Sequence, residues 1–199
     1  MMPRTAVLDA ETILAATEDV LRRHGPAKAT VVDVARALGV SHAAVYRHFS
    51  SKAALREAVT RRWIDRSYDR LAAIADDTTL PPPERLRTWL TALFTAKRAK
   101  ALDDPELTAT YAVLAAEHNS VVAEHVAVLV GQVRAIVSAG AATGDFDVKD
   151  PGAVAQAVFD ATLAFHHPAH APSWQTDGID TAFDHVCTLL IDGLRAAPC

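Results

Sequence analysis

The stretch TVVDVARALGVSHAAVYRHF, residues 30–49, decides how this chain is interpreted. Apolar residues in its two halves, over about 31–38 and 42–49, recur at the spacing of short amphipathic helices. Gly39 stands between the halves, where a tight turn needs a residue that adopts a left-handed backbone conformation without a steric penalty. The stretch therefore predicts two short helices joined at a corner.

Polar residues precede both predicted helices, and the side chains then divide between two faces. Thr30 and Ser41 carry hydroxyl groups that can accept hydrogen bonds from the free amides at a helix start. The apolar residues expected inside the corner are Val34, Leu38, Val40, Val45 and Phe49. The outward face of the second helix is expected to carry Ser41, His42, Ala43, Ala44, Tyr46, Arg47 and His48. Such hydrogen-bonding heads among small residues suit a nucleic-acid groove, although many helical corners with a glycine turn bind nothing.

The residues on either side make the pattern specific. A helix is predicted over about 9–24, and a long helix is expected over about 51–75. Over about residues 8–60 the chain resembles the DNA-binding domain of the tetracycline-repressor (TetR) family of bacterial transcription regulators. The matching residues are Gly25, Thr30, Val34-Ala35, Leu38-Gly39-Val40-Ser41, Val45-Tyr46-Arg47-His48-Phe49 and Ser51-Lys52-Ala53-Ala54-Leu55.

The resemblance implies a partner, double-stranded operator DNA, and residues that contact it. In the family, the Lys and Tyr that match Lys52 and Tyr46 grip phosphate groups. We expect Arg47 or His42 to read base edges. The predicted DNA-binding residues are Thr30, Ser41, His42, Ala43, Tyr46, Arg47, His48 and Lys52.

Length and composition favour an all-α protein. The chain has 199 residues, of which 50% are hydrophobic and 8 are glycine, and no alternating strand pattern is present. The sequence DDTTLPPPE at 76–84 is the clearest break, because three successive prolines cannot continue a helix. We expect about nine helices, arranged as a three-helix, helix-turn-helix DNA-binding domain over 1–52 and an effector-binding and dimerisation domain over 53–199. The latter includes a helix over about 152–166 and an irregular connector over 167–178.

The charges are unevenly distributed along the chain. Residues 1–66 contain 11 Lys and Arg against 7 Asp and Glu, whereas residues 67–199 contain 9 against 17. A basic first part on an acidic remainder indicates that DNA contact is confined to the first part. Ordinary surface scatter is the alternative explanation of the same numbers.

The sequence also bears on the compartment. No apolar run reaches the roughly 18 residues of a membrane span, and the first residues lead into no signal-peptide core. Cys187 and Cys199 do not make a disulfide framework. We therefore expect a cytoplasmic protein in a reducing environment, with no membrane partner.

The second domain carries the residues expected to bind an effector and to form a homodimer. The candidate pocket residues, any of which could instead be core, are Trp63, Trp89, Phe94, Tyr111, Leu114, His118, Phe159 and Phe165. The last two predicted helices are apolar over more than one side, so each must be buried against other helices on two sides. In the resembled family these helices form the dimer interface, which would include Phe183, Val186, Leu190 and Leu194. A buried helix of a monomer is the alternative.

Histidines supply a second hypothesis for the same domain. His125, His166 and His170 could hold a transition metal such as Zn or Ni, because neutral imidazole nitrogens are good ligands. Pro168 interrupts the turn between the last two, and scattered polar residues satisfied by their neighbours are the alternative. A metal site would make the protein a metal-responsive regulator or, with Glu117 or Asp160, a metal-dependent enzyme. The preferred hypothesis is a non-enzymatic repressor that requires no cofactor and is released from DNA by a small molecule.

Overall fold

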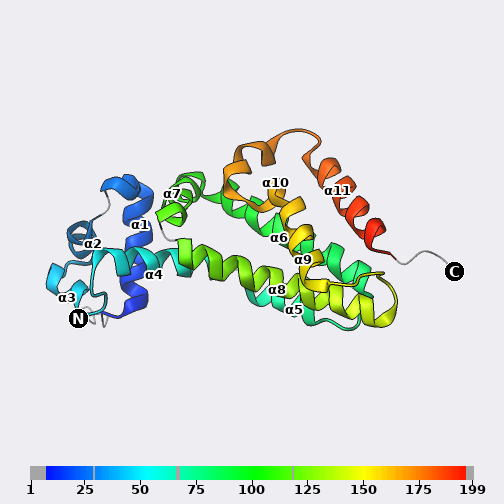
Figure 1. Ribbon diagram of the computed structural model, residues 1–199. Helices are drawn as coiled ribbons and strands as arrows, with labels where there is room; N and C mark the ends of the chain where they lie inside the picture. The colour runs from blue at the N-terminus through cyan, green and yellow to red at the C-terminus, as the bar shows by residue number, and fades with distance from the viewer. Residues whose placement is uncertain (1–7, 29, 66–67, 118, 196–199) are drawn as a thin grey trace, which may run out of the picture. The chain divides into compact units, whose positions relative to one another are not determined.

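The computed structural model describes residues 8–28, 30–65, 68–117 and 119–195, and these residues form helices without a β-strand (Figure 1). The all-α prediction is therefore confirmed. The elements in chain order are α1 (Ala10–Lys28), α2 (Val31–Leu38), α3 (His42–Tyr46), α4 (Lys52–Asp65), α5 (Tyr68–Asp76), α6 (Pro82–Asp103), α7 (Pro105–Glu117), α8 (Asn119–Thr143), α9 (Pro151–Ala161), α10 (Leu163–His166), the 3₁₀ helix η1 (Pro168–Gln175) and α11 (Ile179–Leu194).

Several element boundaries differ from those expected. The helix predicted over 152–166 is divided into α9 and α10 at Thr162, whose hydroxyl donates to the carbonyl oxygens of Val158 and Phe159, 3.0 Å away in each case. A side chain that bonds back to the preceding turn competes with the regular ladder. The helix expected over 51–75 is present as two elements, α4 and α5, and the connector predicted as irregular contains η1. With the division at Thr162, the described part of the chain therefore has twelve helical elements rather than nine.

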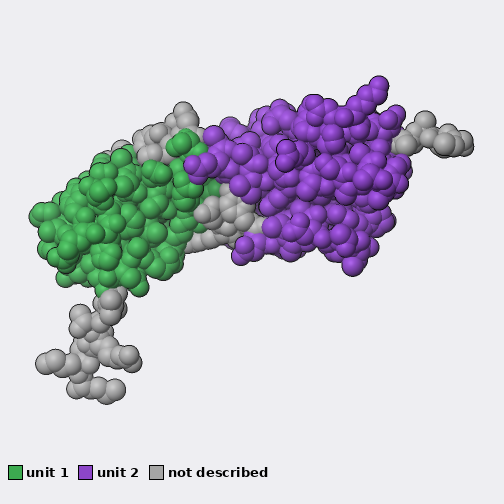
Figure 2. Space-filling view, turned by 60° about the horizontal axis from the view of Figure 1, so that its bottom comes forward, with its two compact units in different colours: residues 1–65, 104–122 green, residues 66–103, 123–199 purple. Residues whose placement is uncertain are grey.

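The chain divides into two compact units, which Figure 2 colours separately. Unit 1 comprises residues 1–65 and 104–122, and unit 2 comprises residues 66–103 and 123–199. Helix α7 thus belongs with the N-terminal helices, although it follows α6 in the chain. The division into a DNA-binding domain over 1–52 and an effector-binding and dimerisation domain over 53–199 stays a prediction.

Unit 1 has its own hydrophobic core, formed by α1 to α4 together with α7. Helix α7 contributes Leu107, Tyr111 and Leu114, which are spaced so that they lie on one helix face. The other buried members are Ile13, Val20, Leu21, Val31, Val34, Ala35, Val45, Leu55 and Val59. The face of the corner expected to be internal is confirmed, since Val34 and Val45 are buried and Leu38, Val40 and Phe49 pack against them.

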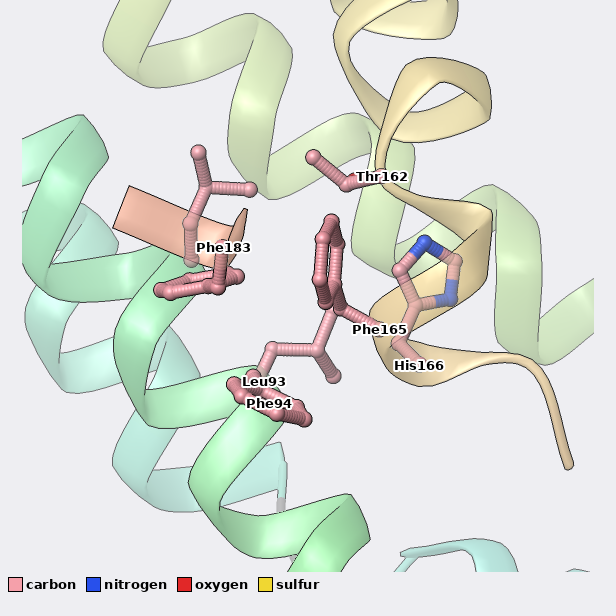
Figure 3. A pocket seen from close by; sticks show the side chains of 7 residues that line it. Leu93, Phe94, Thr162, Phe165, His166 and Phe183 are labelled. Carbon is pink, nitrogen blue, oxygen red and sulfur yellow. The ribbon is translucent and has the colours of Figure 1, made fainter. Parts of the chain in front are cut away.

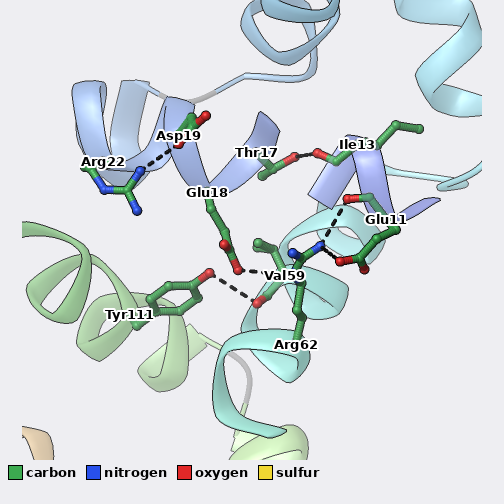
Figure 4. Close-up of polar contacts among 9 residues, drawn as sticks. All are labelled: Glu11, Ile13, Thr17, Glu18, Asp19, Arg22, Val59, Arg62 and Tyr111. Atoms are coloured by element: carbon green, nitrogen blue, oxygen red, sulfur yellow. Dashed lines mark hydrogen bonds and ion pairs between the residues drawn. The ribbon is translucent and has the colours of Figure 1, made fainter. Parts of the chain in front are cut away.

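Polar contacts fasten the helices of unit 1 to one another (Figure 4). Arg62 on α4 pairs with Glu11 at 2.7 Å and with the buried Glu18 at 3.4 Å, both on α1. The Tyr111 hydroxyl donates to the carbonyl oxygen of Val59 at 3.2 Å. A buried carboxylate needs such a partner, so the Arg62 contact fixes how α4 packs on α1.

Unit 2 is built around α6 and α8. Its buried members from these two helices include Leu86, Trp89, Leu90, Leu93, Phe94, Leu129, Val133, Ile136 and Val137. Helix α11 is tied to α6 by two ion pairs, Arg87 with Asp184 at 2.6 Å and Arg98 with Asp180 at 2.7 Å. These pairs accompany the packing of α11 on α6.

Helix α8 is the one described helix that is long and apolar enough to cross a membrane, with a mean hydropathy of 1.6 over its most apolar window. Four of its apolar residues, at positions 129, 133, 136 and 137, are buried in unit 2. Core helices of soluble proteins meet the same criterion of length and composition, so this criterion is weak evidence for a span.

Candidate DNA-binding surface and effector pocket

Thr30 caps the start of α2, as the sequence predicted, and the structure shows that it does so within a capping box with Asp33. The Asp33 amide donates to the Thr30 hydroxyl oxygen at 3.2 Å, and the Thr30 amide donates to the Asp33 carboxylate at 3.2 Å. The Thr30 hydroxyl also donates to that carboxylate at 2.6 Å, and this bond is the main reason why the pKa of Asp33 is lowered. Both polar groups of Thr30 are thereby engaged in shaping the corner.

The turn and the second helix also follow the prediction, with one correction. Gly39 has φ 66° and ψ 27°, the left-handed conformation that favours glycine. Ser41 caps α3 by accepting from the Ala44 amide at 3.3 Å. The side chain of Ala44, expected on the outward face, is buried at 7% exposure because α3 leans on the core of unit 1 at this point.

Of the eight residues predicted to contact DNA, all except the half-buried Thr30 form an exposed surface. Ser41, His42, Ala43, Tyr46, Arg47 and His48 are exposed along α3 and the turn after it, and Lys52 is exposed in the first turn of α4. We call these seven residues the α3 surface. Ser51 accepts from the Ala54 amide at 3.0 Å and so fixes the start of the helix that carries Lys52. An exposed helix flanked by a lysine at a helix N-terminus can meet a groove and its phosphates together.

The predicted pocket residues are divided between the two units. Trp63, Tyr111 and Leu114 lie in unit 1, where the Trp63 and Tyr111 rings stack with centroids 4.3 Å apart. The members in unit 2 are Trp89, Phe94, Phe159 and Phe165. His118 lies outside the described residues. The sequence could not separate these sets, because aromatic spacing along a chain does not reveal which core a residue joins.

Unit 2 contains a narrow hollow, shown in Figure 3. Its lining is Leu90, Leu93, Phe94, Thr162, Phe165, His166 and Phe183, and its empty volume is about 150 Å³. Three of these rings form a cluster, with centroid distances of 5.6 Å for Phe94–Phe165, 4.9 Å for Phe94–Phe183 and 5.2 Å for Phe165–Phe183. The space between these side chains is too narrow to hold even a water molecule, so a ligand must move the rings to enter.

The three histidines proposed as metal ligands are not brought together. The described residues contain no group of three His, Cys, Asp or Glu side chains that could hold a metal ion. Helix α10 ends at His166, and Pro168 begins η1, which leaves His170 exposed. The ring of His166 instead turns inward, where its Nε2 donates to the Phe159 carbonyl oxygen at 3.0 Å.

Burial explains why the pKa values of His125 and His166 are low. Desolvation is the main cause that lowers the pKa of His166 to about 4 and the pKa of His125 to about 3. His125 accepts a hydrogen bond from Lys97, whose Nζ lies 3.3 Å from its Nε2. Sequence reasoning missed Lys97, although its position three residues after Phe94 on α6 was a usable signal, because side chains at this spacing share a helix face.

The residues proposed for the dimer interface have different environments. Phe183 is 8% exposed and belongs to the ring cluster inside its own subunit, so it does not present a surface to a second copy. Val186, Leu190 and Leu194 are partly buried against the core of unit 2. The sequence did not single out Leu189, which is 74% exposed on the same helix.

Known families match both parts of the chain. Residues 13–59 match the family model described as bacterial regulatory proteins, tetR family. Residues 82–187, more than half of the chain, match the model described as tetracyclin repressor-like, C-terminal domain. Two uncharacterized HTH-type transcriptional regulators from two strains of Mycobacterium tuberculosis are 34% identical over 109 residues, 54% of this chain and 51% of theirs. The chain thus spans about half the length of the curated relatives it matches.

Solved structures show the same fold along almost the whole chain. A TetR transcription regulator from Haloarcula marismortui has a TM-score of 0.73 at 21% identity, covering 94% of this chain and 98% of that one. The regulator FadR from Bacillus subtilis, in complex with stearoyl-CoA, has a TM-score of 0.72 at 16% identity, covering 94% and 100%. SmeT, the repressor of a Stenotrophomonas maltophilia multidrug efflux pump, has a TM-score of 0.69 at 17% identity, covering 96% and 90%. With two family models matched along the chain, this protein belongs to the TetR family of bacterial transcription regulators.

Proposed function

We propose that this protein is a homodimeric repressor that binds operator DNA through the α3 surface and leaves it when a small organic effector enters the hollow of unit 2. The observation that carries the proposal is the α3 surface itself, where a helix capped at Ser41 exposes polar side chains next to Lys52. Two proteins of the same fold support the two halves of the proposal, since SmeT is the repressor of an efflux pump and FadR is seen with stearoyl-CoA.

DNA recognition would use the α3 surface in two ways. Tyr46 and Lys52 grip phosphate groups and set the position of the helix, a contribution that does not depend on base sequence. Arg47 or His42 then reads base edges in the major groove, where an arginine can make two hydrogen bonds to a guanine. A homodimer presents two such helices to half-sites about one helical turn apart, roughly 34–36 Å.

Release of the protein from operator DNA would be a shift in the populations of its DNA-binding and non-binding conformations. An effector can weaken DNA binding only by as much as it prefers a conformation that does not fit the operator. The hollow supplies such a preference, because its rings pack so closely that a ligand fits only after Phe94, Phe165 or Phe183 moves. Phe183 is on α11 and Phe94 is on α6, so we propose that this movement shifts one helix relative to the other within unit 2.

The roles of Lys52 and Arg47 can be separated by measuring DNA affinity against salt and sequence. We expect Lys52→Ala to weaken binding to operator and to unrelated duplexes equally, and to reduce the slope of log affinity against log salt by about 1 per contact. We expect Arg47→Ala to cost about 1–3 kcal/mol on the operator only, so that sequence preference is relaxed. Fluorescence anisotropy with labelled duplexes at several salt concentrations measures both quantities.

Lys149→Ala is the matched control, because Lys149 is an exposed lysine of unit 2 and should not alter either measurement. An unchanged salt slope for Lys52→Ala would remove Lys52 from the phosphate contacts. A chain that retards no duplex at low salt would refute the proposed function as a whole.

A further inference from the structure

One residue that lines the hollow of unit 2, His166, interacts electrostatically with two basic residues behind the lining, Lys97 and His125. Lys97 on α6 lies one turn after Phe94, and it donates to His125 on α8 over 3.3 Å. His166 lines the hollow itself and is 6% exposed, and Figure 3 shows it next to Phe165. The positive charge of Lys97 acts on both imidazoles, which places all three groups within electrostatic range. We call Lys97, His125 and His166 the basic cluster.

The charge of Lys97 is not balanced by the protein. Lys97 is half-buried, and no carboxylate among the described residues forms an ion pair with it. An ammonium group has three N–H donors, of which one serves His125, and within the described part of the chain the other two have no hydrogen-bond partner. Burying a cation without an anion is unfavourable, so a group in this state is suited to a ligand that supplies the missing negative charge.

Other charges near the cluster do not remove the imbalance. Lys100 on α6 adds positive charge near Lys97 and His125, and the imidazole of His167 lies near His166. Asp160 on α9 is the negatively charged group that acts on His166, and its carboxylate is exposed and accepts a hydrogen bond from Gln156 at 2.9 Å. The described surroundings of His166 are therefore basic, beside a hollow whose walls are aromatic and aliphatic.

We propose that the effector is a small monocarboxylic acid, with an apolar body that enters the hollow of unit 2 and a carboxylate that binds the free N–H donors of Lys97. The inference rests on the proposed function in one respect, namely that this hollow is the effector site. A neutral molecule of the same shape would fill the hollow but leave Lys97 unbalanced. A cation would be repelled by the basic cluster.

Lys97 also predicts how affinity depends on pH. Burial lowers the pKa of Lys97 to about 8, from an ordinary value of 10.5. A carboxylate needs the charged ammonium, so affinity should fall as the pH rises through about 8, well below the range in which an exposed lysine loses its proton. His125 and His166 stay neutral in this range because burial lowers the pKa of each. The loss of affinity can therefore be assigned to Lys97.

The test is isothermal titration calorimetry on the full chain with octanoate and phenylacetate, each compared with the neutral amide of the same skeleton. We expect the acids to bind at least about ten-fold more tightly than the amides, because hydrogen bonds to charged groups are the stronger ones. Lys97→Met keeps the length of the side chain without the charge, and it should abolish the preference for the acid and the pH dependence. Lys149→Met, at an exposed lysine of the same unit, should change neither.

The stability of the ligand-free variant provides a second readout. If the Lys97 charge is unbalanced, Lys97→Met should unfold at a higher temperature than the natural protein, although it binds acids less well. A lower or equal unfolding temperature would contradict the inference, because it would assign Lys97 a structural role. The inference is also wrong if neither acid binds, or if the amides bind as tightly as the acids.

Operator release is measured separately, so the two proposals can fail independently. If octanoate or phenylacetate binds through Lys97 but leaves the DNA complex intact, the carboxylate site stands and the proposed effector role fails. If DNA is retarded by the protein and no acid binds, the carboxylate inference fails while the DNA-binding function stands.

Discussion

Gly140→Ala should destabilise unit 2 by about 2–3 kcal/mol, although the change adds one methyl group in the middle of a helix. A Cβ at this position would lie 2.1 Å and 2.6 Å from two atoms of the Phe146 ring and 2.9 Å from a third, all shorter than real Cβ contacts. Phe146 is 3% exposed and cannot move outward without leaving the core. For a protein of this size the expected loss corresponds to roughly 5–10 °C in the unfolding temperature measured by calorimetry.

The same helix offers a matched control. Gly131 also lies within α8, and a Cβ there would meet no atom within 4 Å. Gly131→Ala should be neutral or stabilising by up to about 1 kcal/mol, since alanine favours helix more than glycine does. Equal unfolding temperatures for the two variants would show that Phe146 does not press on Gly140 in solution.

The consequence of Gly140→Ala extends to α11. The Phe146 amide donates to the Gly140 carbonyl oxygen at 3.1 Å, and the next amide, of Asp147, donates to Leu194 at 2.9 Å. Phe146 also forms an isolated antiparallel bridge with Arg195. Displacing the Phe146 ring therefore loosens the end of the helix that is expected to form the dimer, and the variant should weaken assembly as well as stability.

Local chemistry explains which parts of this protein could be predicted from the sequence. Thr30, Gly39 and Ser41 act on amides and dihedral angles within a few residues of themselves, so the corner around α2 and α3 was predicted with its caps and its turn. Ala44 was misplaced because α3 leans on the core of unit 1 at this point, which buries a residue expected on the outward face.

Long-range packing explains the rest. The position of α7 in unit 1 depends on its contacts with α1 and α4, which no pattern within α7 encodes. Helix α11 is apolar on more than one side, so its sequence predicted burial but not which side faces α6. The packing of Phe183 on the Phe94 and Phe165 rings decides this, and the exposed ion pairs of Asp180 and Asp184 with arginines on α6 accompany it.

The histidine hypothesis illustrates the same limit. The spacing of His166 and His170 matched that of two ligands on one helix face, and Pro168 was the local sign that the helix does not continue. The partner that gives His125 its role, Lys97, lies 28 positions away on another helix. The sequence does not show that Lys97 on α6 lies beside His125, so the class of ligand suited to the hollow could be inferred only from the structure.

Leu189→Asp should convert the proposed homodimer into monomers without unfolding them. Leu189 is 74% exposed in the single chain, so an aspartate there stays in water and costs the isolated subunit little. In an apolar interface between two-fold related copies, each subunit would instead bury an unpaired carboxylate, and the penalty would be doubled by symmetry. Sedimentation velocity should show the monomer. Calorimetry should show that unit 2 still unfolds in a cooperative transition, as expected of a folded monomer.

Loss of the dimer should be the largest single effect on DNA binding. Two linked recognition helices gain affinity because the second binds at a high effective concentration, a contribution of about 10²–10⁴ in avidity. Leu189→Asp leaves the α3 surface untouched, so a labelled half-site should bind with unchanged affinity while the full operator loses this factor. Comparing the two duplexes separates assembly from recognition.

Val128→Asp is the control for this change, because Val128 is an apolar residue with 49% exposure on α8, outside the proposed interface. It should stay dimeric and keep its affinity for the full operator. Phe183→Asp, by contrast, should unfold unit 2, since it places a carboxylate among the Phe94 and Phe165 rings. If Leu189→Asp remains dimeric while Val128→Asp dissociates, the interface lies on α8, and the partly buried side chains of Val186, Leu190 and Leu194 only complete the core of their own subunit.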